Sequence, residues 1–333
     1  MTHYTLLIMT HYFLGADVGS TKTHVAIADE TGRVLSLGEG GAGNPDNVGY
    51  EGLRRTLEIA TRSAVQQAGI TLDQIAGAGY GVSGLDYPSQ KTPTLQAIAS
   101  IGLCAPTEAV NDALIGLIAG ATDGWGLAVV SGTGCNCWGW DRQRRQGQVT
   151  GGGWQMGEYA GSSELAARAV QLVAYEWTRR GPATQLTPAL IKYVGATDVV
   201  DLLHGLTWGR FDIDAAAAPL IFDVAAQGDA VAIDLIHWAG RELGQLAKAV
   251  IRQLNFEALE FDVVLLGSMF NGGARLIDPM RDSIAELASG ARLVRLQTLP
   301  VVGAVLLGME QAQWPITPEI RAELKRTAVK RDA

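Results

Sequence analysis

The fold of this chain is decided by two glycine-rich turns, Gly15-Ala-Asp-Val-Gly-Ser-Thr-Lys-Thr23 and Val129-Val-Ser-Gly-Thr-Gly-Cys-Asn136. Each turn follows an apolar segment with a strand pattern and leads into a second strand pattern. Glycine lets the backbone approach a ligand closely, and the N–H groups exposed in such turns bind anions. With the pair Asn111-Asp112 between them, the two turns predict a nucleotide phosphate held between two related lobes.

Length, composition and charge exclude several classes of protein. The chain has 333 residues, 47% of them hydrophobic, and 41 glycines, which suits two globular domains with many tight turns. Its net charge is −8, with no run of Lys or Arg inside the body, so nucleic acid and anionic membrane surfaces are poor partners. The apolar stretches, such as 301–309, are shorter than the ~20 residues of a membrane span.

The chain start and the cysteines indicate a cytoplasmic protein. No basic segment of a signal peptide precedes the short apolar run at the start, and Met1-Thr-His-Tyr4 recurs as Met9-Thr-His-Tyr12. We expect residues 1–9 to contribute little, and whether they are native is open. Three cysteines form an odd and sparse set, as in a reducing compartment. Cys135 and Cys137 lie on one predicted strand without zinc-site spacing, so we interpret them as packing thiols.

The same order of elements occurs twice along the chain. In the first half we predict strands at 12–18, 23–28, 33–37, 75–82 and 108–110, with helices at 49–68, 92–101 and 111–121. In the second half we predict strands at 126–130, 135–140, 148–150, 261–266 and 292–296, with helices at 163–179, 229–254, 272–287, 300–313 and 318–330. Two strand meanders, each followed by alternating helices and strands, predict an α/β chain with a duplicated architecture.

The motifs resemble those of the actin-like ATPase superfamily, which includes sugar kinases, actin and heat-shock chaperones. Within it the chain is most similar to the N-acetylglucosamine kinase and BadF/BadG/BcrA/BcrD-type ATPase family, from Phe13 to about Glu310. The family's two phosphate loops, connecting Asp, adenosine motif and second connecting helix match 17–23, 131–136, 111–112, 266–271 and 302–305. The resemblance implies a two-lobed, ribonuclease H-like duplicated fold. We expect a first lobe at 1–122, a second at 123–303, and C-terminal helices at 304–333 that pack back on the first.

The resemblance also implies ATP and Mg²⁺ as cofactors. Phosphoryl transfer depends on positioning and on neutralising the charge of the γ-phosphate. A carboxylate beside the first loop, Asp17, suits Mg²⁺ directly or through water, although Asp17-x-Gly alone is also a common capped turn. The residues expected to bind the nucleotide are Gly19, Ser20, Thr21 and Lys22 in the first loop, Gly132, Thr133 and Gly134 in the second, and Gly267, Ser268 and Asn271 in the adenosine motif.

Asp112 is the expected catalytic residue. It lies where a predicted strand meets a predicted helix, so capping of that helix by Asn111 or Asp112 is the plain alternative. The resemblance implies that Asp112 is a general base that accepts the proton of a sugar hydroxyl. A capping position and a catalytic role are compatible.

The expected sugar contacts also follow from the resemblance. They are Asn44, Ser83, Gly84, Asn136, Trp154 and Glu158. Asn44 before a proline is also typical of a turn, and Trp154 could pack as part of a lid. Relatives read Gly-Asp-Glu-Gly-Ser where this chain has Gly157-Glu-Tyr-Ala-Gly-Ser162, so Glu158 would replace a sugar-contacting Asp. Glucosamine, N-acetylglucosamine and N-acetylmuramate therefore all remain open as acceptors.

The sequence thus predicts an ATP-dependent kinase that phosphorylates a hydroxyl, the 6-OH, of an amino sugar such as N-acetylglucosamine or glucosamine. One alternative is an activator ATPase of a radical dehydratase, which holds an iron–sulfur cluster with cysteines at a dimer interface. The other is a sugar-sensing regulator without catalysis, for which the dozen residues before the first strand leave no room for a helix-turn-helix. We expect a small-molecule sugar partner and leave the oligomeric state, a homodimer included, open.

Overall fold

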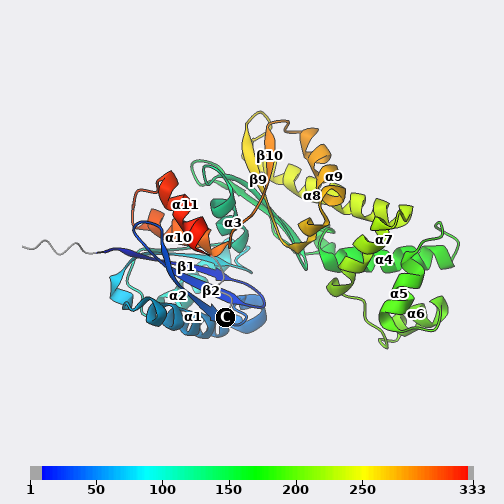
Figure 1. Cartoon of the computed structure of the whole chain (residues 1–333), viewed down its shortest axis with the longest axis horizontal. Coiled ribbons are helices and arrows are strands. Elements are labelled where there is room, and N and C mark those ends of the chain that lie inside the picture. The colour runs from blue at the N-terminus through cyan, green and yellow to red at the C-terminus, as the bar shows by residue number, and fades with distance from the viewer. Residues whose placement is uncertain (1–9, 329–333) are drawn as a thin grey trace, which may run out of the picture. The chain divides into compact units, whose positions relative to one another are not determined.

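The computed structural model describes residues 10–328, so residues 1–9, which we expect to contribute little, lie outside the described residues. The chain divides into two compact units. The first combines Met1–Trp125 with Arg295–Ala333, and the second is Gly126–Val294. Figure 1 shows the elements of each unit, with the C-terminal helices in red beside the blue strands of the first.

The first unit is built on a five-stranded mixed sheet of order β3-β2-β1-β4-β5. Its strands are β1 (Tyr12–Val18), β2 (Thr23–Asp29), β3 (Val34–Gly40), β4 (Ile75–Val82) and β5 (Thr107–Val110). The first three form the antiparallel meander that the sequence predicted, and β4 and β5 add parallel to β1. The inward faces of these strands are buried, which fixes their register.

Five α-helices complete the first unit within the described residues. They are α1 (Pro45–Ala68), α2 (Pro88–Ala99), α3 (Asp112–Gly120), α10 (Val301–Gln311) and α11 (Pro318–Thr327), with a short 3₁₀ turn at Leu72–Gln74. Helix α10 packs on β1, β4 and α3. It crosses α3 so closely that a Cβ at Gly303 would lie 1.8 Å from the Ile115 carbonyl oxygen. The predicted connecting-helix motif is therefore a helix-crossing point that only glycine fits.

The second unit repeats the sheet of the first. Its order is β10-β9-β6-β7-β8, and the strands are β6 (Gly126–Ser131), β7 (Cys135–Trp140), β8 (Gln146–Val149), β9 (Phe261–Leu266) and β10 (Ala291–Arg295). Again the first three strands form an antiparallel meander, and the fourth pairs parallel with the first. Numbered within each unit, both sheets have the order 3-2-1-4-5, which confirms the predicted duplication.

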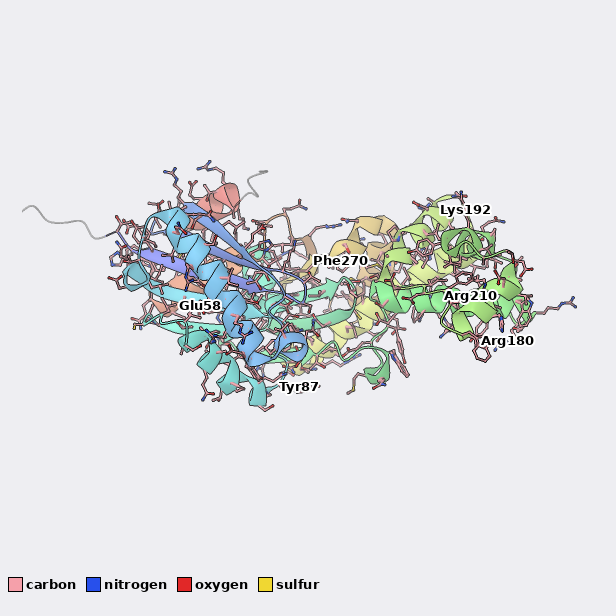
Figure 2. All side chains as sticks on the ribbon, turned by 90° about the horizontal axis from the view of Figure 1, so that it is seen from below. Glu58, Tyr87, Arg180, Lys192, Arg210 and Phe270 are labelled. Carbon is pink, nitrogen blue, oxygen red and sulfur yellow. The ribbon has the colours of Figure 1, made fainter. Side chains whose placement is uncertain are left out.

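The helices of the second unit include three that the sequence pattern did not predict. The unit contains α4 (Ser162–Trp177), α5 (Leu186–Val194), α6 (Val199–Thr207), α7 (Ala218–Ala226), α8 (Ala230–Leu254) and α9 (Ala274–Ala285). Helices α5, α6 and α7 have 9 residues each, so each contains only about two and a half helical turns. They fill the connection between α4 and α8, where Figure 2 labels Lys192 and Arg210.

Two helices have starts that differ from a simple helical run. The bounds of α1 begin at Pro45, where the side chain of Asn44 accepts a hydrogen bond from the Asp46 N–H at 2.9 Å. Gly49 has a non-helical backbone (φ 69°, ψ 169°), so a short helical segment precedes this kink and the long helix follows it, in agreement with the predicted range 49–68. Helix α2 starts at Pro88, since proline is well suited to the first helical position. Both starts lie near the candidate site, so their geometry affects the residues discussed next.

Candidate active site

The first glycine turn is closed by backbone hydrogen bonds. It connects β1 to β2, and the Gly19 N–H donates to the Lys22 carbonyl at 2.9 Å. The Gly43 N–H in turn donates to the Gly19 carbonyl at 3.0 Å, which ties the turn to the segment before α1. Ser20, Thr21 and Lys22 are exposed, so their polar groups are open to a ligand.

Two partly buried carboxyl groups lie behind this turn. Asp17 is the penultimate residue of β1, and Asp112 is the first residue of α3. Burial raises the pKa of Asp17 to about 6, against the opposing charge of Lys22. Burial also raises the pKa of Asp112 to about 7, and the negative charge of Asp17 adds to this rise. The two carboxyl groups therefore share one environment and influence each other's ionisation.

The N-cap position of α3 is held by Asn111, the residue before Asp112. The Ala113 N–H donates to Asn111 Oδ1 at 2.9 Å, so Asn111 is the N-cap of α3. Its amide group is held in place because Asn111 Nδ2 donates to Asp86 Oδ1, also at 2.9 Å. The Asp112 carboxylate accepts hydrogen bonds from the Ser83 hydroxyl and from the first N–H groups of the helix, which favour its ionised form.

Three of the predicted first-unit residues, Ser20, Ser83 and Gly84, lie around a fourth, Asn44. Asn44 is buried, and its Nδ2 atom lies 3.1 Å from Ser20 Oγ and 3.4 Å from Ser83 Oγ. Gly84 has a φ of 83°, and a Cβ there would lie 2.3 Å from Asn44 Oδ1. Asn44 therefore caps α1 and also joins the glycine turn to Ser83, which in turn contacts Asp112.

The second glycine turn is held against the start of α4. The Ser162 N–H donates to the Gly132 carbonyl at 2.8 Å, and the Ser163 N–H donates to the Thr133 carbonyl at 3.0 Å. The Ser131 hydroxyl is also fixed, because it donates to the Ala160 carbonyl at 2.6 Å. The positive end of the α4 dipole thus lies beside this turn, an arrangement that suits anionic groups.

The predicted adenosine motif packs directly on the second turn. Gly267 has a φ of 106°, and a Cβ there would lie 2.1 Å from the Ser131 carbonyl oxygen. Ser268 begins a short 3₁₀ turn that contains Asn271, and both side chains are exposed. The structure thus brings Gly132, Gly267 and Ser268 together within the second unit.

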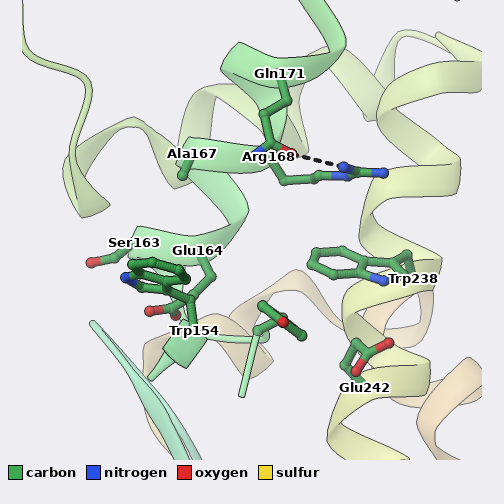
Figure 3. A pocket seen from close by; sticks show the side chains of 9 residues that line it. Trp154, Ser163, Glu164, Ala167, Arg168, Gln171, Trp238 and Glu242 are labelled. Carbon is green, nitrogen blue, oxygen red and sulfur yellow. Dashed lines mark hydrogen bonds between the residues drawn. The ribbon is translucent and has the colours of Figure 1, made fainter. Parts of the chain in front are cut away.

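The predicted sugar residues of the second unit have three different surroundings. Glu158 is only 2% exposed, and its Oε2 accepts a hydrogen bond from the Gly153 N–H at 2.9 Å, which closes its own loop. Trp154 is 65% exposed and lines a pocket with a volume of about 780 Å³ (Figure 3). Asn136 lies on β7, and its buried Oδ1 has no hydrogen-bond partner within residues 10–328.

Sequence reasoning missed most of the residues that line this pocket. They are Tyr159, Ser163, Glu164, Ala167, Arg168, Gln171, Trp238 and Glu242. Most of them belong to α4 and α8. The apolar stripe of each helix predicts which face is buried, but it does not predict that side chains outside the stripe line a pocket. A large aromatic residue outside the stripe, such as Trp238, was the one available signal.

A metal site would depend on Asp17. In the described part of the chain, no group of three or more His, Cys, Asp or Glu side chains is arranged to hold a metal ion. Mg²⁺ usually keeps several waters and takes one or two protein carboxylates together with substrate phosphates. Asp17 fits this donor set, because a hard cation would relieve the cost of ionising a partly buried carboxyl group beside Asp112.

Two further observations bear on the sequence interpretation. No helix among residues 10–328 is long and apolar enough to cross a membrane. Cys135 and Cys137 are buried and Cys104 is exposed, and all three are free thiols.

Curated relatives match nearly the whole chain. An N-acetylmuramic acid/N-acetylglucosamine kinase from Clostridium acetobutylicum is 24% identical over 305 residues, which are 90% of this chain and 99% of the relative. An N-acetyl-D-glucosamine kinase from Dictyostelium discoideum is 25% identical over 314 residues, covering 89% of this chain and 97% of the relative.

Solved structures show the same two-lobed fold. A crystal structure from Chromobacterium violaceum, provisionally assigned as an N-acetylglucosamine kinase, has a TM-score of 0.65 at 25% identity and covers 89% of this chain and 98% of that one. A ROK family glucokinase from Streptomyces griseus, solved with glucose and AMPPNP, has a TM-score of 0.56 at 18% identity over 90% of this chain and 99% of that one. The family profile matches residues 14–308, and the chain belongs to the BadF/BadG/BcrA/BcrD ATPase family.

Proposed function

We propose that this protein is an ATP-dependent kinase that phosphorylates a hydroxyl group, the 6-OH, of an amino sugar. The observation that carries the proposal is the Asp112 carboxyl group, which is partly buried, close enough to Asp17 to respond to its charge, and hydrogen-bonded to Ser83. Its pKa of about 7 matches the proton acceptor that transfer to a sugar hydroxyl requires near neutral pH. The two curated relatives, both named as amino-sugar kinases, support this acceptor class.

In the proposed reaction Asp112 accepts the proton of the sugar hydroxyl. A hydroxyl group is a weak nucleophile, and it must lose this proton as it attacks the γ-phosphorus. Ser83 and the first N–H groups of α3 hold the carboxylate in place. Asn111 caps the helix, so Asp112 can take up a proton while the helix start keeps its cap.

The nucleotide would be held by the residues that the sequence predicted. Backbone N–H groups of the two glycine turns would bind phosphate oxygens, and Lys22 would add a positive charge. Asp17 would hold Mg²⁺, which when bound neutralises charge on the phosphates. The contact of Gly267 with Ser131 supports a nucleotide site in which the adenosine motif and the second turn act together.

The relatives favour this function over the activator ATPase. Both curated relatives are named as sugar kinases. The alignments with this chain cover 97–99% of each relative, so the similarity is not confined to a shared ATPase core. The likeness to an ATPase fold alone would support either function. We therefore infer that the substrate partner of this chain is a small-molecule sugar.

The test is a coupled ADP-release assay with a panel of glucosamine, N-acetylglucosamine, N-acetylmuramate and glucose. We expect turnover with at least one amino sugar, at a kcat/KM above that for glucose, and loss of turnover when excess chelator removes Mg²⁺. ADP release that is independent of every sugar, or undiminished in chelator, would contradict the proposal.

A further inference from the structure

A short turn in the first unit contacts both residues of the Asn111-Asp112 pair. It spans residues 83–86 and follows β4 directly. Its first residue, Ser83, is hydrogen-bonded to the Asp112 carboxylate. Its last residue, Asp86, accepts a hydrogen bond from Asn111 Nδ2 at 2.9 Å. Two side chains of one turn therefore hold two neighbouring residues at the start of α3.

The turn is itself fixed at both ends. The Ser83 N–H donates to the Val18 carbonyl, at the end of β1, at 2.9 Å. The N–H groups of Asp86 and Tyr87 both donate to Gln90 Oε1, each at 2.8 Å. The carboxylate of the turn is therefore presented to α3 from a segment that has little freedom to move.

The Asn111 amide uses both of its ends. Its Oδ1 atom accepts a hydrogen bond from the Ala113 N–H, and its Nδ2 atom donates to Asp86. Asn111 is only 3% exposed, so water is a poor substitute for either partner. Without the Asp86 carboxylate a buried donor would lose this partner, which is unfavourable and would favour a movement of the amide. Because Asp112 follows directly in the chain, such a movement would also shift its carboxyl group.

The alternative is that Asp86 contacts a substrate directly. Its side chain is partly buried, and its Oδ1 atom is already engaged by the Asn111 amide. A carboxylate that contacts a substrate or a cation acts largely through its charge, whereas an acceptor for a neutral amide acts through its oxygen atom. Substitutions that remove the charge and the oxygen separately therefore distinguish the two roles.

We propose that Asp86 is a positioning residue for the general base. It fixes the Asn111 amide, and the cap that Asn111 provides then keeps Asp112 oriented toward the sugar hydroxyl. The inference rests on the proposed function, because it takes Asp112 as the base. It assigns Asp86 no contact with sugar, nucleotide or metal.

The test compares Asp86→Ala with Asp86→Asn. The first removes the acceptor oxygen, and the second removes the charge but keeps an acceptor oxygen. We expect Asp86→Ala to lower kcat about 10–100-fold, since a small misplacement of a catalytic group can reduce the rate by about 10²-fold. The KM values for ATP and sugar should change little, and Asp86→Asn should keep a kcat close to that of the wild-type protein. Equal losses in the two variants would overturn the inference, because the charge of Asp86 would then be what matters.

A double-mutant cycle tests whether Asp86 acts through Asn111. Asn111→Ser keeps a good N-cap residue but removes the donor Nδ2. We expect this variant to lose a similar part of kcat, and Asp86→Ala to cause no further loss in its background. Additive losses would show that Asp86 acts by another route and would overturn the inference. Should Asp86→Ala fail to fold, Asn111→Ser replaces it, because it breaks the same hydrogen bond from the other side.

Asp29→Ala is the matched control for a loss of stability. Asp29 belongs to the same unit and lies at the end of β2 away from the first glycine turn. Its Oδ1 atom also supports a turn, because it accepts hydrogen bonds from the N–H groups of Thr31 and Arg33 at 2.9 and 3.1 Å. The control should unfold at a lower temperature and keep kcat. An equal fall in kcat in Asp29→Ala and Asp86→Ala would assign both to general destabilisation and overturn the inference.

Amide hydrogen exchange separates this inference from the proposed function, because it needs no substrate. The first turn of α3 should exchange faster in Asp86→Ala than in the wild-type protein, and at the wild-type rate in Asp86→Asn. Faster exchange in Asp86→Ala, with no sugar phosphorylated by the wild-type protein, would support the anchoring of Asn111 and contradict the kinase function. Sugar phosphorylation by the wild-type protein, with exchange and kcat unchanged in Asp86→Ala, would leave the kinase function standing and overturn the inference.

Discussion

The two units share one sheet order but differ at the end of their first strands. In the first unit the penultimate residue of that strand is Asp17, and in the second it is Val130. The first turn is tied to Gly43 and Asn44, which belong to the predicted sugar loop. The second turn is tied to α4 and contacts Gly267 of the adenosine motif. Duplication thus supplied two similar turns, which we propose bind phosphate, and their different surroundings suit a division between chemistry and nucleotide binding.

The connection after the meander differs as well. In the first unit α1 follows β3 within a few residues, whereas in the second unit α4–α7 lie between β8 and the long helix α8. This insertion provides the wall of the Trp154–Trp238 pocket through α4. The longer connection of the second unit thus adds a pocket that the first unit's short connection does not provide.

The largest effect on kcat should come from a change of Asp112, the proposed general base, which lies in the first unit. Asp112→Asn keeps the shape of the side chain and the cap provided by Asn111, but it removes the basicity. We expect kcat to fall about 10²–10⁴-fold, the usual contribution of a general base, with a nearly unchanged Kd for ATP. Steady-state kinetics and nucleotide titration measure both. Near-normal turnover would show that Asp112 is not the general base. The proposed division, with chemistry in the first unit and nucleotide binding in the second, would then be wrong.

The next largest effect should be on the KM for ATP, from a change in the second unit. Gly267→Ala places a Cβ 2.1 Å from the Ser131 carbonyl oxygen, so the second turn must move. We expect the KM for ATP to rise roughly tenfold or more, since a 1.4 kcal/mol loss of binding is tenfold. Gly273→Ala is the control, because it also has a positive φ, 65°, but meets no atom within 4 Å. Equal effects of the two variants would show that backbone strain, and not the contact, is responsible.

A glycine-to-alanine change in the first unit should instead raise the KM for the sugar. Gly84→Ala places a Cβ 2.3 Å from Asn44 Oδ1, which is a side-chain atom and can give way more easily than backbone. We expect the KM for the sugar to rise by a few-fold to about tenfold, with the KM for ATP little changed. A rise in the KM for ATP alone would mean that Asn44 belongs to the nucleotide side.

The smallest effect concerns stability. The pKa of Asp112 is about 7 in the folded chain and 3.8 as an unperturbed group. A raised folded-state pKa contributes stability that is complete below the unfolded value and is lost as the pH rises through about 7. Asp112→Asn cannot ionise, so it should be more stable than the wild-type protein at pH 8 and similar to it at pH 4. Urea unfolding at both pH values measures the difference, and lower stability of the variant at pH 8 would contradict it.

The strands of both sheets could be predicted from the sequence because most are rich in apolar residues and are bounded by turn residues. The bounds of β1, β4, β7 and β9 agree with the predicted ranges. Helices α5–α7 were not predicted, and their nine residues give little more than two turns of periodicity. Helix α3 is equally short, but the Asn111-Asp112 pair marks its start.

The candidate site was predictable only as a set of motifs. The first-unit set of Ser20, Asn44, Ser83 and Gly84 does converge, but the division of roles between Asn111 and Asp112 needed side-chain geometry. Arg168 and Trp238 are far apart in sequence, and their proximity depends on how α4 packs against α8. No local pattern encodes such a contact.

The central claim is that Asp17 and Asp112 form a coupled carboxyl pair tuned for proton transfer. The most direct measurement is the ¹³C NMR titration of the aspartate carboxyl carbons in the ligand-free protein, with Asp112→Asn to assign the signal. The account predicts that Asp112 titrates with a pKa of about 7 and that Asp17→Asn lowers this pKa, because the charge of Asp17 helps to raise it. An Asp112 carboxyl group that titrates near 4, or is unaffected by Asp17→Asn, would contradict the account.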